Sequence, residues 1–261
     1  MSDLEIFSGL TGLLGEGRGG ALCTIIEKRG SGPRDLGAKM LVDPDGRTTG
    51  TLGGGGMERI VVRKALKALM DGRPTTITFA LGVEPRGGAI AVDSKCGGEV
   101  RVFIDIVKPE PRLVLVGSGH IAKPLAELAH MVGFETIVVD DAPTATKKRF
   151  PTASAILSGP FEDELDGLEV RPSDFVAVVH GETPHELAAL RKMLRLKPLY
   201  IGLLGSRNKA EGHRNRLLAE GFSREEVDAI HAPIGLDIGA ETPEEIALSI
   251  VAELIRERRR G

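Results

Sequence analysis

The stretch of residues 112–141 does most to limit what this chain can fold into. It begins with a short apolar run, residues 113–116, of the kind that forms a buried parallel strand. A glycine-containing turn follows, and apolar residues then recur at helical spacing. A second apolar run, residues 136–139, ends in Asp140 and Asp141. The order strand, turn, helix, strand predicts a βαβ unit, and therefore a parallel sheet.

The turn of this unit has the pattern G-x-G-x-x-A, in which each small residue has a mechanical role. Gly117 permits the tight turn, Gly119 lets the backbone approach a diphosphate, and Ala122 keeps the helix close to the strand. The helix N-terminus offers free N–H groups to an anion, and Asp140 follows at the spacing expected for a ribose contact. The pattern predicts a mononucleotide or dinucleotide site; the alternative is a structural turn without a ligand.

Further strands and helices alternate after this unit, with strands expected at residues 155–157, 174–180 and 200–204. This alternation predicts a doubly wound parallel sheet of Rossmann type, which binds ligands at the carboxyl ends of its strands. Eight polar residues should converge there: Ser118, His120, Asp140, Asp141, His180, Ser206, Arg207 and Lys209. The alternatives are that His180 is a structural histidine and that Arg207 belongs to a solvated helical turn.

The first half of the chain has a different pattern, which predicts a smaller α+β domain. An amphipathic helix is expected over residues 4–14, and strands over residues 21–27, 39–43, 75–81 and 100–107. The turn sequence at residues 43–46 predicts a hairpin.

A run of four glycines in this half leads into a second predicted helix. Gly53, Gly54, Gly55 and Gly56 precede Glu58, and such a run sacrifices much backbone entropy. A loop that closes on a ligand needs that freedom, so we predict an anion site here; the alternative is a flexible connector.

The two cysteines have different surroundings in the sequence. Cys23 lies within an apolar strand and is expected to be inert. Cys96 follows Lys95, whose charge would lower a thiol pKa, and is the candidate for an accessible thiol, although it could instead be a small buried residue. The sequence has no zinc-ligand spacing near Cys96 and identifies no metal.

Composition excludes several classes of function. A net charge of −3 and an aromatic content of 3% argue against nucleic-acid binding. We expect no membrane span and no signal peptide, and two cysteines in 261 residues suit a reducing, cytoplasmic location. Pro109 and Pro111 indicate a stiff linker, so we predict domains at residues 1–108 and 112–261.

These motifs together resemble the XdhC/CoxI family of xanthine dehydrogenase accessory proteins over nearly the whole chain. The similarity rests on GSGPR with GAKM, GGGGME and CGG in the first half. In the second half it rests on GSGHIAKPLAELAHMVGF, DD, RFP, YIGLLGSR and PIGLDIG with TPEEIA. Where the family commonly has a cysteine in its glycine loop, this chain has Gly56. The family's usual Asp-Asp-Arg is here Asp140-Asp141-Ala142, and the threonine before the histidine is Val179.

The resemblance implies a dimeric maturation factor that binds molybdenum cofactor (molybdopterin, free or nucleotide-linked), protects it and assists its sulfuration, with a cysteine desulfurase as a candidate partner. It would deliver the cofactor to a molybdenum hydroxylase apo-enzyme of the xanthine dehydrogenase or CO dehydrogenase type. We expect Gly117–Ala122, Asp140 and Arg207 to hold the phosphate or nucleotide end, and Arg34, Gly53–Gly56 and Cys96 to face the metal end.

Two other functions remain open at the level of sequence. One is an NAD(P)- or flavin-dependent oxidoreductase, in which His180 would donate a proton. The other is a nucleotide-binding interaction module without cofactor cargo. Because no general acid–base pair or nucleophile constellation is evident, a cofactor-insertion chaperone is favoured over an enzyme with turnover.

Overall fold

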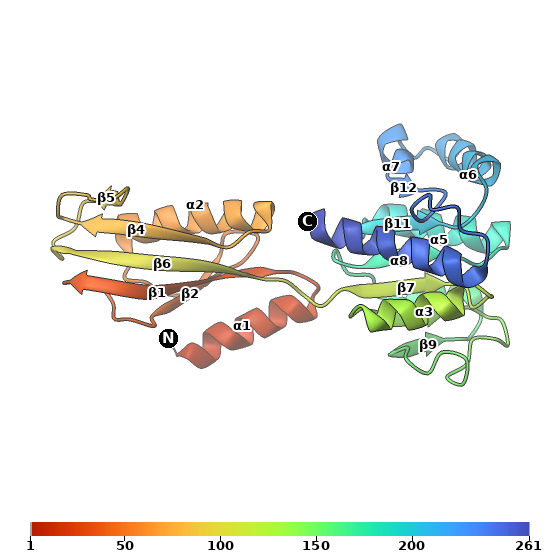
Figure 1. Ribbon diagram of the computed structural model, residues 1–261, viewed down its shortest axis with the longest axis horizontal. Helices are drawn as coiled ribbons and strands as arrows, with labels where there is room; N and C mark the ends of the chain where they lie inside the picture. The colour runs from red at the N-terminus through yellow and green to blue at the C-terminus, as the bar shows by residue number, and fades with distance from the viewer. Residues whose placement is uncertain (1, 261) are drawn as a thin grey trace. The chain divides into compact units, whose positions relative to one another are not determined.

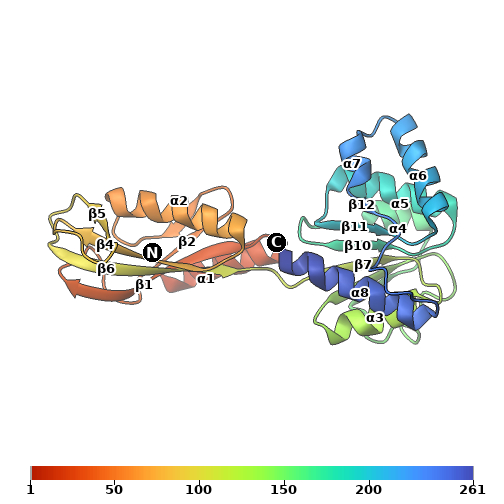
Figure 2. The same cartoon turned by 45° about the horizontal axis from the view of Figure 1, so that its top comes forward.

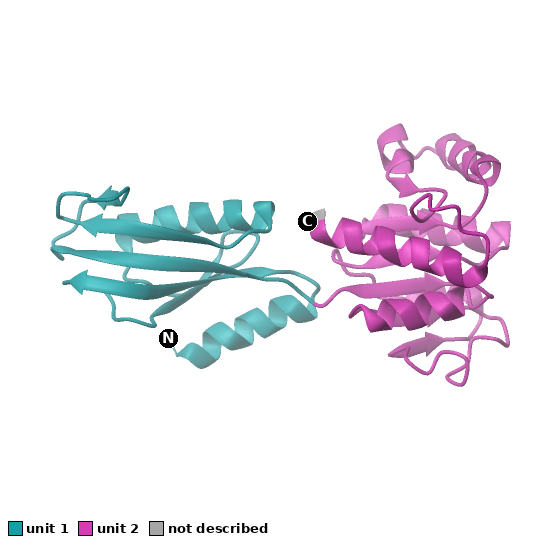
Figure 3. Cartoon of the chain, in the orientation of Figure 1, with its two compact units in different colours: residues 1–109, 261 teal, residues 110–260 magenta. Residues whose placement is uncertain are grey.

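The computed structural model describes residues 2–260, which form two compact units, one ending at Pro109 and the other spanning Glu110–Arg260 (Figure 3). Met1 and Gly261, at the outer ends of the predicted domain ranges, lie outside the described residues. Within the described part, every helix is too short or too polar to cross a bilayer.

The first unit is an antiparallel-rich sheet with a helix on each face. The strand order is β3-β2-β1-β6-β4-β5, and only the β4–β5 pair is parallel among the described pairings. Its elements are α1 (Asp3–Gly15), β1 (Gly20–Gly30), β2 (Lys39–Val42), β3 (Thr48–Gly50), α2 (Gly55–Asp71), β4 (Thr75–Leu81), β5 (Ile90–Val92) and β6 (Gly98–Val107).

The helices α1 and α2 lie on opposite faces of this sheet (Figure 1). Cys23 and Met40 point to the face covered by α2 and join the main core of the unit. Leu41 points to the other face and packs on Ile6 and Leu10 of α1. The period of two in β1 and β2 therefore produces a three-layer unit.

The second unit is a six-stranded parallel sheet in the order β12-β11-β10-β7-β8-β9, counted over the described residues. Its strands are β7 (Arg112–Val116), β8 (Glu135–Val139), β9 (Ala155–Leu157), β10 (Phe175–Val178), β11 (Tyr200–Leu203) and β12 (Ile230–His231). Its helices are α3 (Ala122–Met131), α4 (Phe161–Gly167), α5 (Thr183–Leu196), α6 (Arg207–Ala219), α7 (Arg224–Asp228) and α8 (Pro243–Arg260).

This strand order reverses direction between β7 and β10, as in a Rossmann fold, so the predicted fold class is confirmed. Leu113 and Leu115 of β7 pack with residues of α3 and α8. These two helices lie together on one face of the sheet (Figure 2). Val114 and Val116 pack with α4 and α5 on the other face. The continuous apolar run in β7 is thus explained by burial on both sides.

A buried ion pair fixes the start of the central strand. Arg112 donates two hydrogen bonds to Asp174, of 2.9 and 2.6 Å, and both side chains are almost fully buried. This fork-to-carboxylate geometry ties the first residue of β7 to the residue before β10.

Candidate functional site

The glycine turn of the second unit lies at the topological switch point of the sheet, between β7 and β10. Gly117 follows β7 with a φ of 119°, and a Cβ there would lie 2.6 Å from the Cα of His180, just after β10. A side chain at this position is therefore excluded by both conformation and space. At Gly119, by contrast, an added Cβ meets no atom within 4 Å, so the turn is open to a ligand.

Asp140 is the acid predicted to contact a ribose, and its carboxylate is directed at the glycine turn. Oδ2 accepts a 2.5 Å bond from the N–H of Ser118, and Oδ1 accepts a 3.1 Å bond from the N–H of Ala142. His180 Nε2 lies 3.2 Å from Oδ1, and both side chains are about 95% buried. Both carboxylate oxygens thus already have protein partners, and a ribose hydroxyl would have to share them.

This arrangement shifts the pKa values of both partners. Burial alone would raise the pKa of Asp140, but His180 and the Ser118 N–H outweigh burial and hold the pKa well below its usual range. The same contact with Asp140 raises the pKa of His180 against the opposing effect of burial. A negative charge is therefore fixed beneath the glycine turn, and His180 is its counter-ion when protonated.

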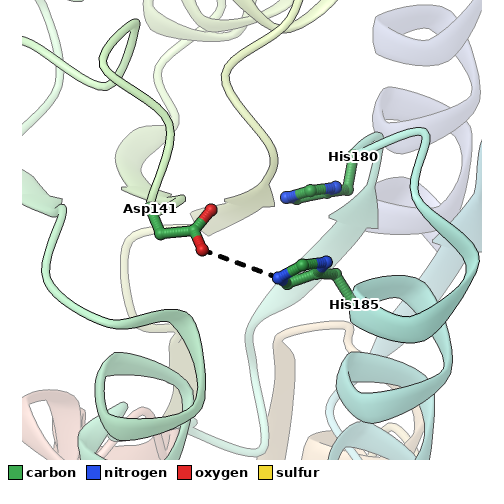
Figure 4. A group of neighbouring side chains, drawn as sticks. All are labelled: Asp141, His180 and His185. Carbon is green, nitrogen blue, oxygen red and sulfur yellow. Dashed lines mark ion pairs between the residues drawn. The ribbon is translucent and has the colours of Figure 1, made fainter.

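Asp141 and His185 lie beside His180 (Figure 4), and both side chains are more exposed than that of His180. The ring of His185, on the first turns of α5, stacks on the ring of His180 at 4.4 Å between centroids and 12° between planes. His185 Nε2 lies 3.6 Å from Asp141 Oδ2. Phe161 of α4 packs edge-on against both imidazoles and closes their apolar side. Asp141, His180 and His185 together could hold a metal ion.

Two residues that the sequence did not single out as site residues support the turn. Arg149 donates hydrogen bonds to the carbonyls of Ser118, at 3.1 Å, and Gly119, at 3.0 Å. The hydroxyl of Thr144 lies 2.5 Å from that of Ser118. Arg149 is part of the RFP motif and could have been identified from it. His185 belongs to no such motif, and the sequence indicates only that it lies near the start of a helix.

The remaining residues predicted at the carboxyl ends have different surroundings. Ser206 caps α6 by accepting a bond from the N–H of Lys209, whose Nζ in turn pairs with the buried Glu186 at 2.7 Å. His120 and Arg207 are exposed. Arg207 lines an open pocket of about 460 Å³ formed by the end of β11 and residues 233–240.

In the first unit, the glycine loop is organised by Glu58. One oxygen of its carboxylate, Oε1, accepts bonds from the hydroxyl of Thr51 and from the N–H groups of Leu52, Gly53 and Gly54, at 2.5 to 3.0 Å. Burial would raise the pKa of Glu58, but these donors lower it overall. The loop therefore already encloses an anion, which belongs to the chain itself.

The other predicted residues of this unit lie on adjoining loops. A Cβ on Gly53 would overlap Pro33, so the loop carrying Arg34 lies against the glycine loop. A Cβ on Gly98 would overlap the carbonyl of Ser31, which brings the Cys96 loop to the same end of the sheet. Cys96 is half-buried against the core of the unit.

The rest of the glycine loop and the other cysteine are also placed by the structure. Gly55 and Gly56 begin α2, and a Cβ on Gly56 would lie 3.3 Å from Val92. Cys23 is fully buried, and burial raises the pKa of its thiol to about 12, as expected for an inert cysteine.

Comparison with known proteins covers both units. Residues 113–254 match the model described as the XdhC Rossmann domain, and residues 13–80 match the model of the XdhC and CoxI family. The chain is a member of the XdhC and CoxI family. The recognition made from its motifs is therefore confirmed.

Two relatives of this chain are considerably longer than the chain itself. The chain is 38% identical to protein YqeB of Escherichia coli K12 over 90% of its own residues, but it spans only 43% of that protein. It is also 38% identical, over 61% of its residues, to a probable xanthine dehydrogenase subunit from Bacillus subtilis 168, of which it spans 46%. The chain thus spans less than half the length of these two relatives.

Two further proteins are similar to this chain over most of its length and over most of their own. The molybdenum cofactor insertion chaperone PaoD of Escherichia coli K12 is 26% identical over 91% of this chain and 83% of its own length. A crystal structure described as a xanthine dehydrogenase from Bacillus halodurans is 27% identical, with a TM-score of 0.53 over 99% of this chain and 96% of that one. The similarity of this XdhC-family chain to these two proteins therefore covers residues of both units.

Proposed function

We propose that this chain is a molybdenum-cofactor chaperone that supports the maturation of a molybdenum hydroxylase. The observation that carries the proposal is membership of the XdhC and CoxI family over both units, together with similarity along most of the chain to a cofactor insertion chaperone. The cofactor is cargo rather than a resident group, so binding and release, not turnover, are the chemistry that these residues must provide.

The geometry of the second unit suits the phosphate end of such a cargo. The open space at Gly119 and the N-terminus of α3 offer room and N–H donors to an anion. Arg149 holds two carbonyls of the turn and adds a positive charge beside it. The occupied carboxylate of Asp140 argues against a dinucleotide-dependent oxidoreductase that would rely on this acid for ribose.

The finer parts of the proposal rest on the first unit. Arg34, the glycine loop and Cys96 adjoin one another and would face the metal end of the cofactor, and Cys96 is then the candidate thiol because Gly56 replaces the family cysteine. We propose that sulfuration by a cysteine desulfurase, delivery to a xanthine or CO dehydrogenase-type apo-enzyme and homodimerisation also apply to this chain.

The test is to incubate purified protein with molybdenum cofactor and to measure molybdenum and pterin that co-elute on size exclusion. A Gly119→Val, Arg207→Ala double variant should retain at least tenfold less cofactor, because valine fills the open space at the turn and the pocket loses its cation. Gly212→Val is the matched control, since an added Cβ there also meets nothing within 4 Å. No cofactor binding by the wild type, or equal binding by the double variant, would contradict the proposal.

A further inference from the structure

A cluster of two histidines and one carboxylate lies at the carboxyl ends of β8 and β10. Asp141 follows β8, His180 follows β10, and His185 lies near the start of α5. One possible ligand atom from each residue lies within 4.8 Å of the other two. Figure 4 shows both imidazole rings directed toward Asp141. The fold thus brings three separate segments together near the topological switch point of the sheet.

Among the described residues, one buried ring nitrogen of this cluster, His180 Nε2, lacks a well-aligned hydrogen-bond partner. The His180 side chain is only 6% exposed, and its nearest charged neighbour is the Asp140 carboxylate. Its other ring nitrogen, Nδ1, is 3.4 Å from the N–H of Glu182. When Nε2 loses the proton that otherwise faces Asp140, its buried lone pair has no donor directed at it, and a metal ion would satisfy it.

The surroundings of His185 match those of a metal-bound histidine. Its Nδ1 lies 3.4 Å from the Glu182 carboxylate, while its Nε2 faces Asp141. Metal-binding histidines commonly direct their other ring nitrogen to a carboxylate, which fixes the tautomer and the ring orientation. Phe161 packs against both rings and limits their rotation.

Charge also favours a cation at this point. Asp140 and Asp141 carry two negative charges, and the two imidazoles are neutral when they act as ligands. A divalent ion would balance these charges. We propose that Asp141, His180 and His185 bind a divalent first-row transition-metal ion, with Asp140 and Glu182 as outer carboxylates.

The three ligand atoms, which lie within 4.8 Å of one another, must move closer together to hold an ion. Ligand atoms that are each about 2.0 to 2.2 Å from zinc lie about 3 to 3.5 Å apart in a tetrahedral site. The separation of 3.6 Å between His185 Nε2 and Asp141 Oδ2 is already close to this range. Because Asp141 is 42% exposed and His185 24% exposed, both can shift, and the ion has a path from solvent.

The ligand set leaves coordination positions free. Two histidines and one carboxylate on one side of an ion are found in catalytic zinc sites and in the facial triad of iron(II) proteins. The open positions point to a site that accepts an exchangeable ligand, and they distinguish it from a closed structural site with four protein ligands. This proposal goes beyond cofactor carriage and does not depend on it.

The test is a cobalt(II) titration of the tag-free, chelator-treated chain of residues 1–261, followed by visible absorption and then by displacement with zinc(II). The wild type should bind one ion per chain saturably, develop the d–d bands of a nitrogen- and oxygen-ligated ion, and rise in melting temperature with added zinc. His185→Gln and Asp141→Asn change partly exposed side chains, and each should weaken binding at least tenfold.

His130→Gln is the matched control, because His130 is an exposed histidine on α3, and this variant should bind cobalt as the wild type does. Circular dichroism of each variant separates loss of binding from loss of fold. Absence of saturable binding in the wild type, or equal affinity in His185→Gln and Asp141→Asn, would overturn the proposal. Since no molybdenum cofactor is present in this titration, its failure leaves the proposed function untouched, and the reverse also holds.

Discussion

Glu253 of α8 is predicted to be a main determinant of stability in the second unit. Its Oε2 accepts bonds of 2.7 Å from the hydroxyl of Tyr200 and from the N–H of Gly235. Its Oε1 accepts a 2.8 Å bond from Arg256 and lies 3.2 Å from Nδ1 of His231. One carboxylate thus links α8 to β11, to β12 and to the segment that lines the open pocket.

The magnitude follows from the pKa of this carboxylate. Burial would raise the pKa, but the bonds from His231, Tyr200 and Gly235 outweigh burial and lower it from 4.5 to about 2. A difference of this size corresponds to about 3 kcal/mol of folding free energy. Glu253→Gln keeps one acceptor oxygen, so we expect it to reduce the free energy of unfolding by about 2 kcal/mol at pH 7.

The pH dependence has a defined sign. A carboxylate whose pKa is lowered by folding stabilises the protein fully above its unfolded pKa, and that stabilisation is lost as the pH falls. The difference between wild type and Glu253→Gln should therefore be full above about pH 5 and shrink progressively toward pH 2.

Tyrosine fluorescence in a urea titration gives a direct assay, because the chain has one tyrosine, Tyr200, and no tryptophan. The signal therefore reports the unfolding of the second unit alone. Glu241→Gln is the control, since it removes the same charge from an exposed side chain and should change stability by less than about 0.5 kcal/mol. Equal stability of Glu253→Gln and wild type at pH 7, or an undiminished difference at pH 3, would show that the Glu253 carboxylate does not stabilise the second unit.

Three further changes test other parts of the structure. Gly117→Ala should lower the free energy of unfolding by at least about 2 kcal/mol in the same assay, because its Cβ would overlap the backbone after β10 at a positive φ. Asp174→Asn should lower the free energy of unfolding by about 3 to 5 kcal/mol, because it leaves the buried Arg112 without its counter-ion. A loss of stability smaller than that of Glu241→Gln would contradict this expectation. Glu58→Ala should accelerate amide hydrogen exchange at Gly53 while the core strands stay protected, and unchanged exchange would show that the carboxylate does not order the loop.

The fold could be predicted largely because its long elements have strong periodicity. The range expected for β4 agrees with the structure at both ends, and the ranges expected for α1 and β7 lie within one residue of the observed ends. The sequence did not predict β5, α4, α7 or β12, which have seven residues or fewer. Such short elements are formed by pairing and packing with longer neighbours, and hydrophobic periodicity cannot detect them.

The candidate site was predictable in position but not in contacts. The rule that ligands bind at the carboxyl ends of strands predicted that Ser118, Asp140, Asp141 and His180 would meet, and these residues adjoin one another. The rule could not predict that the Asp140 carboxylate accepts hydrogen bonds from backbone N–H groups of the protein, because these bonds depend on the conformation of the folded turn.

In the same way, the spacing of the glycine loop predicted an anion site but not that Glu58 would occupy its donors. His185 joins the site only through packing of α5 against α4. The binding roles of all these residues stay predictions.

The proposed cargo of this chain is a molybdenum cofactor. The most direct measurement is native mass spectrometry, with metal and small-molecule analysis, of the protein purified gently from cells that make the cofactor. We expect a molybdenum-containing pterin to be retained at up to one per chain and to be lost from the Gly119→Val, Arg207→Ala variant. A retained nicotinamide or flavin without molybdenum, or an empty protein under conditions that load PaoD, would contradict it.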